Sequence, residues 1–222
     1  MLIVLEGLDG SGKSTQLRLL EAWLRGQGYA PLAIKLPHYE EESSVLVRQY
    51  LAGRFGEKPG DVNAYAAAAF YAVDRYAGFR SLWETSYRAG RIILADRYTG
   101  SNAYHQATKL PKAAWESYFS WLEDFEYAKL GVPKPDLVLY LDMPPELSRR
   151  LLSKRYEGDE SRRDLHETDF AYLLACRETA LAAVDAMGWQ KIDCAANGAI
   201  DSPEELHARI RSCVKRLLSG SS

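Results

Sequence analysis

Long apolar runs, charge of one sign and paired cysteines are all scarce in this chain of 222 residues, and each shortage excludes a class of protein. The first apolar stretch ends at Glu6, too early for a secretory signal peptide, and no later run is long enough to cross a membrane. The formal net charge is −2 at pH 7, whereas a nucleic-acid-binding domain usually has a basic surface. We therefore expect a soluble, cytoplasmic protein that has neither a membrane nor a nucleic acid as its partner.

The cysteines are odd in number and form no CxxC pair; they are Cys176, Cys194 and Cys213. A zinc site or a disulfide framework usually requires paired spacing, so we expect reduced thiols with a mostly structural role. Hydrophobic residues make up 47% of the chain and charged residues 26%, which is typical of a globular protein. The length suits a single α/β domain over residues 1–222.

Glycine and lysine gather directly after the apolar run at residues 2–5. The pattern Gly7-x4-Gly12-Lys13-Ser14 is that of a Walker A phosphate loop, and it lies between a predicted strand and a predicted helix, as that loop requires. Glycines let backbone N–H groups turn toward phosphate oxygens, Lys13 would reach the terminal phosphates and Ser14 would bind Mg²⁺. The sequence therefore predicts a nucleoside triphosphate site formed by Gly7, Gly10, Ser11, Gly12, Lys13, Ser14 and Thr15.

Short apolar runs alternate with helical periodicity along the rest of the chain. Further strands are predicted at residues 32–36, 91–95, 137–141 and 190–192. The longer helices are predicted at residues 16–26, 62–88, 111–129, 164–187 and 203–218. We expect Asp61 to cap the helix that begins at residue 62. Such alternation favours a parallel sheet covered on both faces, with functional groups at the carboxyl ends of its strands.

Polar side chains follow two of these strands. Asp96 and Arg97 come directly after the strand at residues 91–95, and Arg48 lies downstream of Pro37, where the second strand ends. Two arginines beside a phosphate loop suit an acceptor with its own phosphate, because guanidinium groups bind phosphate oxygens bidentately. Asp96 would hold the acceptor oxygen or a Mg²⁺-bound water. The alternatives are solvated surface for either arginine and a cap after the strand for Asp96.

Two other features suit a nucleotide kinase. Tyr71 and Arg75 are four residues apart on one helical face and could form a base pocket; the alternative is a core tyrosine with a surface arginine. The charged segment at about residues 154–165 has no apolar stripe and is either a solvated loop or a lid. Because position 10 of the phosphate loop is glycine, an arginine that stabilises the transferred phosphoryl group would have to come from such a lid.

The sequence resembles the thymidylate kinase family of P-loop nucleoside monophosphate kinases over nearly the whole chain. Besides the phosphate loop, the specific matches are Tyr71-Ala72-Val73-Asp74-Arg75, Asp96-Arg97-Tyr98 with Ser101-Asn102 and Gln106, and Asp164-Leu165-His166-Glu167. The resemblance implies phosphoryl transfer from MgATP to dTMP. It also implies a P-loop NTPase fold with a five-stranded parallel sheet of order 2-3-1-4-5, a short lid, and a homodimer through helices near residues 45–88.

The resemblance further implies the roles of single residues. Asp9 would hold the acceptor sugar hydroxyl, and His105 stands where an aromatic ring usually abuts that sugar. The dTMP site would comprise Asp9, Pro37, Arg48, Tyr71, Arg75, Arg97, Asn102 and Gln106, in which Tyr71 replaces the usual Phe that stacks on thymine. The catalytic residues would be Lys13, Arg97, Arg163 and Asp9, with Arg155 or Arg162 as alternatives to Arg163. Ser14 and Asp96 would hold the metal.

Two other functions stay open at this point. A deoxynucleoside kinase would phosphorylate a hydroxyl and would need a carboxylate base near the sugar, whereas Arg48 and Arg97 suit a phosphate. A nucleotide-dependent regulatory switch that reads guanine would need a motif such as Asn-Lys-x-Asp, which the sequence lacks.

Overall fold

The computed structural model describes residues 1–155, 170–196 and 198–220. Its centre is a five-stranded parallel sheet in the order β2-β3-β1-β4-β5, which confirms the predicted topology. The strands are β1 (Leu2–Glu6), β2 (Leu32–Lys35), β3 (Ile93–Asp96), β4 (Leu137–Asp142) and β5 (Gln190–Asp193). A small antiparallel pair, β6 (Ala195–Ala196) with β7 (Ala199–Ile200), was not predicted from the sequence.

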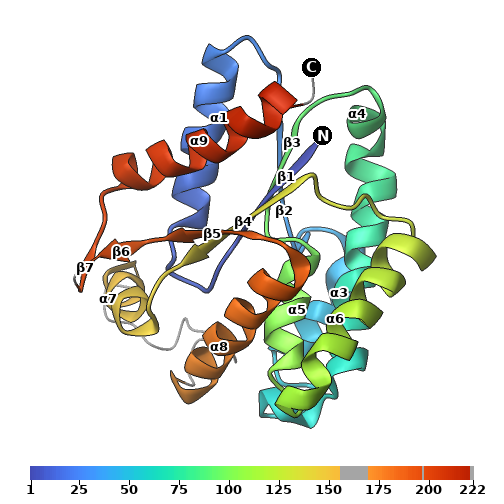
Figure 1. Cartoon of the computed structure of the whole chain (residues 1–222). Helices are drawn as coiled ribbons and strands as arrows, with labels where there is room; N and C mark the ends of the chain where they lie inside the picture. Colours follow the sequence, from blue (N-terminus) through green and yellow to red (C-terminus); the bar gives the residue numbers. More distant parts are fainter. Residues whose placement is uncertain (156–169, 197, 221–222) are drawn as a thin grey trace.

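Helices cover both faces of the sheet, with α1 and α9 on one side and α3, α5 and α6 on the other (Figure 1). The helices are α1 (Lys13–Gly26), α2 (Val45–Leu51), α3 (Ala64–Gly78), α4 (Glu84–Arg88), α5 (Thr99–Ala107), α6 (Trp115–Glu123), α7 (Pro145–Arg155), α8 (Phe170–Met187) and α9 (Pro203–Gly220). Two π-helical turns, Phe79–Trp83 and Asp124–Lys129, follow α3 and α6.

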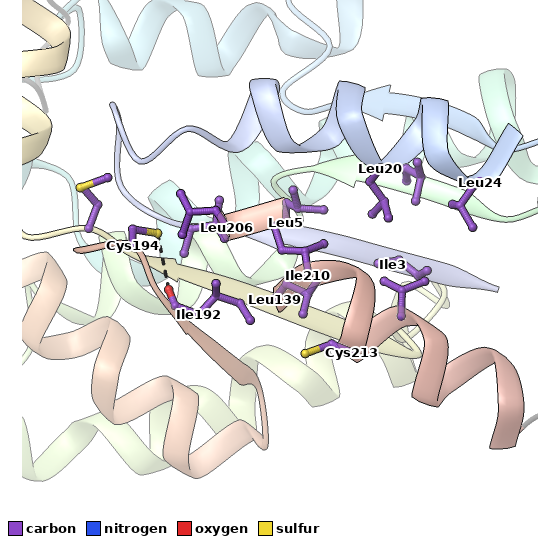
Figure 2. Packing of buried hydrophobic residues seen from close by; sticks show 14 of the residues in the cluster. Ile3, Leu5, Leu20, Leu24, Leu139, Ile192, Cys194, Leu206, Ile210 and Cys213 are labelled. Atoms are coloured by element: carbon purple, nitrogen blue, oxygen red, sulfur yellow. Dashed lines mark hydrogen bonds between the residues drawn. The ribbon is translucent and has the colours of Figure 1, made fainter. Parts of the chain in front are cut away.

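The central strand β1 is buried along its whole length, and its side chains alternate between the two faces. Ile3 and Leu5 belong to the hydrophobic cluster beneath α1 and α9 (Figure 2). Leu2 and Val4 belong to a second cluster that includes the π-helical turn Phe79–Trp83. Because both faces of β1 are packed, the segment that follows it leaves the sheet from a rigid base at the carboxyl edge.

Two local predictions differ from the structure. The cap of α3 is Asn63, whose side chain accepts a hydrogen bond of 2.9 Å from the backbone N–H of Ala66. The prediction that Asp61 caps this helix is therefore wrong; Asp61 accepts a hydrogen bond from the N–H of Lys58 in the preceding 3₁₀ turn. The helix α5 was not predicted at all. All of its residues except Ser101 are buried, yet Thr99, Asn102, His105 and Gln106 are polar, so its sequence has no stripe of large apolar residues to reveal a helical period.

The three cysteines are free thiols, as predicted, and all three are buried. Within the described ranges, no helix is long and apolar enough to cross a membrane. The predicted lid begins at residue 154, and its first two residues, 154 and 155, are the last two of α7. The rest of the predicted lid lies outside the described residues.

Candidate active site

The phosphate loop joins β1 to α1, as its pattern predicts, and three of its glycines adopt backbone conformations that other residues rarely take. Gly7, Gly10 and Gly12 have φ values of +148°, +76° and +91°. At Gly7, a Cβ atom would also lie 2.8 Å from the carbonyl oxygen of Leu141. α1 begins at Lys13 with no side-chain cap, so its first N–H groups are available to an anion.

A pocket of about 360 Å³ lies over this loop. It is lined by Asp9, Gly10, Gly12, Lys13, Ser14, Thr15, Lys35, Asp96, Arg97 and Leu151. Beside it, the hydroxyl of Ser11 is buried and has no hydrogen-bond partner among the described residues. A phosphate oxygen would accept a hydrogen bond from this hydroxyl, which no described protein group does. The loop is therefore suited to a phosphate ligand.

Lys13 points into the loop, and its ammonium group donates hydrogen bonds of 2.8 Å to the Gly7 carbonyl and 2.9 Å to the Leu8 carbonyl. Burial lowers the pKa of Lys13 to about 8, and the charge of Arg97 acts in the same direction. The nearby carboxylates, of which Asp9 acts most strongly, oppose this shift. The lysine is therefore held as a poorly solvated cation that phosphate oxygens would stabilise.

The two predicted metal-binding residues lie together. The hydroxyl of Ser14 donates a hydrogen bond of 2.8 Å to the carboxylate of Asp96 at the end of β3. Among the described residues no group of three or more His, Cys, Asp or Glu side chains could hold a metal ion. The Ser14 hydroxyl and the Asp96 carboxylate nevertheless fit Mg²⁺. This ion usually takes one or two protein oxygens and completes its coordination shell with phosphate oxygens and water.

Arg97 adopts an unusual backbone conformation, with φ +70° in a residue other than glycine. This conformation costs about 1–3 kcal/mol and turns the guanidinium into the pocket. Its Nη2 lies 2.5 Å from Asp9 Oδ1, and its Nη1 donates to the hydroxyl groups of Ser101 and Tyr104 at 3.2 Å. Burial raises the pKa of Asp9, but the charges of Arg97 and Lys13 outweigh it, so the pKa of Asp9 lies well below its usual range.

Two of the residues predicted to contact the base, Arg75 and Asn102, bind a carboxylate that sequence reasoning missed. Arg75 is 3% exposed and forms a bidentate ion pair with the fully buried Glu126, with Nε–Oε2 at 2.5 Å and Nη2–Oε1 at 3.0 Å. Asn102 donates to Glu126 Oε1 and to the carbonyl of Ala68, both at 3.1 Å. Arg75 is thus neither a surface residue nor a free cation. Tyr71 on the same helix is half-buried and meets the ring of Tyr50 edge-on.

The predicted acceptor-phosphate residues are only partly brought together. Pro37 follows β2, and Arg48 is an exposed residue of α2 that does not line the pocket described above. The Arg48 guanidinium donates instead to the Tyr39 carbonyl at 2.5 Å. The buried carboxylate of Asp74 accepts from the backbone N–H of His38 at 2.9 Å, so α3 fixes this loop.

A sequence model of the family described as "Thymidylate kinase" matches residues 5–210. The chain belongs to the thymidylate kinase family. It is 31% identical to "Thymidylate kinase" of Mycobacterium tuberculosis (strain ATCC 25618 / H37Rv), over 85% of this chain and 87% of that relative. It is also 31% identical to "Probable thymidylate kinase" of Thermococcus kodakarensis, with 98% of each chain covered. A thymidylate kinase of Synechococcus sp. is 28% identical over 96% of this chain. The fold is accordingly the P-loop NTPase fold.

The three arginines predicted as candidates for the lid are Arg155, Arg162 and Arg163. Arg162, Arg163 and the side chain of Arg155 lie outside the described residues.

His105, by contrast, is buried in α5. Its Nδ1 lies 3.6 Å from the Cys176 sulfur, and its ring stacks on Tyr172.

Glu6 is a second carboxylate that sequence reasoning missed. Its Oε1 accepts the backbone N–H groups of Tyr98 and Ser101 at 2.8 and 3.0 Å, and its Oε2 accepts the hydroxyl groups of Ser101 and Tyr104 at 2.7 and 3.0 Å. Burial raises the pKa of Glu6, while Arg97 and these hydrogen bonds oppose the shift. The one signal in the sequence was a charged residue at the end of an apolar strand.

Proposed function

We propose that this chain transfers the γ-phosphoryl group of ATP to dTMP, which gives dTDP and ADP. The observation that carries the proposal is that Lys13 and Arg97, one suited to donor phosphates and the other to an acceptor phosphate, line the same pocket. Membership of the thymidylate kinase family supports dTMP as the acceptor and ATP as the donor.

On the donor side, Lys13 exchanges the carbonyls of Gly7 and Leu8 for phosphate oxygens, and the orphaned Ser11 hydroxyl gains a partner. Ser14 and Asp96 would hold Mg²⁺. When bound, the ion would offset the negative charge of the donor phosphates.

On the acceptor side, Arg97 and Arg48 bind the phosphate of dTMP, and Asp9 accepts from its sugar hydroxyl. Tyr71 stacks on the base, Pro37 borders it, and Arg75, Asn102 and Gln106 contact its edge. The acceptor phosphate is already an oxyanion, so no strong general base is needed and the residues act by positioning and by offsetting charge. Arg97 suits this role because Asp9 fixes its guanidinium beside the phosphate loop.

We also propose that residues 1–222 form one domain with a lid at about residues 154–165, from which Arg163 stabilises the transferred group. Replacing Arg163 by Ala should lower kcat and leave the Kd for dTMP nearly unchanged. An unchanged kcat would move the role to Arg155 or Arg162.

A homodimer is proposed through the helices near residues 45–88. Its support is a set of large apolar side chains that are 37–51% exposed on this part of the chain: Val45, Leu46, Phe55, Tyr65, Val73, Tyr76 and Leu82. Exposed apolar side chains that form one contiguous patch usually mark a protein interface. Sedimentation of the wild type and of Val73→Asp should give a dimer and a monomer, respectively.

The free, buried cysteines fit a reducing compartment, and we place the protein in the cytoplasm.

A panel of acceptors tests the proposal. With MgATP, turnover should be high with dTMP and low with thymidine, dCMP and purine monophosphates. A preference for thymidine would favour a deoxynucleoside kinase instead. Slow ATP hydrolysis that no acceptor stimulates would favour a regulatory switch.

A further inference from the structure

Glu126 is a buried carboxylate that connects three elements of the fold. It lies in the π-helical turn Asp124–Lys129, which continues α6, and it contacts Arg75 of α3 and Asn102 of α5. These helices lie side by side on one face of the sheet (Figure 1). π-Helical turns are rare and often occur at functional sites.

The ion pair fixes which donors of Arg75 remain for a ligand. Glu126 accepts from Nε and Nη2, and the guanidinium carbon lies 5.1 Å from the centre of the Tyr98 ring. Among the described residues no hydrogen bond uses Nη1. Arginine has no acceptor atom, so whatever group meets this edge must itself accept a hydrogen bond.

The same carboxylate fixes the amide of Asn102. Its nitrogen donates to Glu126 Oε1 and to the Ala68 carbonyl, so both of its hydrogens are committed and only Oδ1 is left for a ligand. One helical turn later, Oε1 of Gln106 is buried and has no partner within the described part of the chain. α5 therefore offers acceptors and needs a donor.

A donor on α3 and acceptors on α5 together complement a base edge with a carbonyl oxygen next to a ring N–H. Thymine and uracil have this imide edge, whereas cytosine inverts both groups, since its exocyclic amine donates and its ring nitrogen accepts. Guanine shares the pattern on a larger ring, so cytosine is the informative comparison.

We infer that Glu126 sets the donor–acceptor polarity of the base pocket and thereby makes it selective for imide bases over cytosine. Glu126 is a positioning residue, because it acts through Arg75 and Asn102 and not on the base itself. The inference rests on the proposed function in so far as the acceptor base occupies this pocket. A merely structural ion pair would stabilise the fold without affecting the choice between dTMP and dCMP.

The test compares Glu126→Gln and Glu126→Asp with the wild type. In Glu126→Gln, the amide N–H faces Arg75 in either orientation, and in one orientation it faces Asn102 as well, so the guanidinium is displaced or turned. Glu126→Asp keeps the charge that Arg75 requires but is one methylene too short to reach both partners. The control is Glu84→Gln in α4, where Glu84 accepts from Arg80 and Arg88. For each protein, kcat/KM is measured with dTMP and dCMP, and binding of each nucleotide alone by thermal shift.

We expect the dTMP-to-dCMP ratio of kcat/KM to fall at least about tenfold in Glu126→Gln, to fall less in Glu126→Asp, and to hold in Glu84→Gln. Folded Glu126→Gln with a ratio within about twofold of the wild type would overturn the inference, as would an equal fall in the control. If Glu126→Gln does not fold, Glu126→Asp decides by the same comparison. A wild type that binds dTMP over dCMP but transfers no phosphoryl group would refute the proposed function, and the binding ratios would still decide the role of Glu126.

Discussion

Ser14 and Asp96 are 82 residues apart in sequence, and the hydroxyl of one donates a 2.8 Å hydrogen bond to the carboxylate of the other. The first turn of α1 and the end of β3 therefore meet at one pair of oxygen atoms. This pair is the part of the proposed metal site that the protein supplies, and its small size makes the rate sensitive to the loss of either oxygen.

Replacing Ser14 by Ala removes one of these oxygens and leaves Asp96 in place. We expect the Mg²⁺ concentration that gives the half-maximal rate to rise about tenfold or more, since losing a group around a metal commonly costs that much. Titration of the rate with Mg²⁺ at fixed ATP measures the change. An unaltered Mg²⁺ requirement would exclude Ser14 as a ligand.

The activity should fall at alkaline pH because of Lys13. Its pKa is lowered to about 8, so the ammonium group that we propose binds phosphate is lost as the pH rises through that value. We expect kcat/KM for ATP to drop about tenfold per pH unit above about 8. Burial also lowers the pKa of Lys109 to about 8, but Lys109 donates to Tyr50 and Val62. The Lys109→Met variant should therefore show the same fall in kcat/KM above about pH 8. A wild-type kcat/KM that stays constant up to pH 10 would contradict the assignment to Lys13.

Gly78 and Gly26 are helical glycines with opposite surroundings. A Cβ at Gly78 would clash with the His38 ring, whereas one at Gly26 would meet nothing within 4 Å. Gly78→Ala should destabilise the protein by about 1–3 kcal/mol and, by moving the loop that carries Pro37, raise KM for dTMP more than for ATP. Gly26→Ala should be neutral or stabilise by about 0.4–1 kcal/mol. Thermal unfolding and two KM values check both; equal behaviour of the two variants would show that the clash is relieved freely.

Breaking the Arg75–Glu126 pair on one side should cost more than replacing both partners. Arg75→Met leaves a buried carboxylate unpaired, and we expect a loss of about 3–5 kcal/mol in the free energy of unfolding. The double variant Arg75→Met/Glu126→Leu should recover much of that loss, because apolar side chains of similar size tolerate burial. Urea unfolding followed by circular dichroism gives the values. A loss below about 1 kcal/mol in the single variant would show that the pair is not the buried ion pair described above.

Local sequence predicted the strands well because buried strands form short apolar runs between turn residues. The order of the sheet came from the family resemblance, since pairing over distances such as that between Leu2 and Ile93 leaves no local signal. The helix cap was wrongly predicted at Asp61 because Asn63, two residues later, is an equally good capping residue, and only packing decides between them. The helix α5 was missed because its buried face is formed largely by polar residues, which leave no apolar stripe in the sequence.

In the candidate site, too, features formed by consecutive residues were predicted and features formed by distant residues were not. The phosphate loop was predictable because its function resides in consecutive residues. Glu126 was not, because its partners lie 51 and 24 residues away, at Arg75 and Asn102, and nothing near it in sequence marks it as buried. Arg75 was predicted to face a ligand but not to be neutralised by a carboxylate.

Glu6 has a further consequence. It directly precedes Gly7 of the phosphate loop, and its carboxylate holds the turn from which Arg97 projects. A single buried side chain thus connects the phosphate loop to Arg97, which we propose binds the acceptor phosphate. The separation between the two proposed phosphate sites is therefore set when the chain folds, before either nucleotide binds.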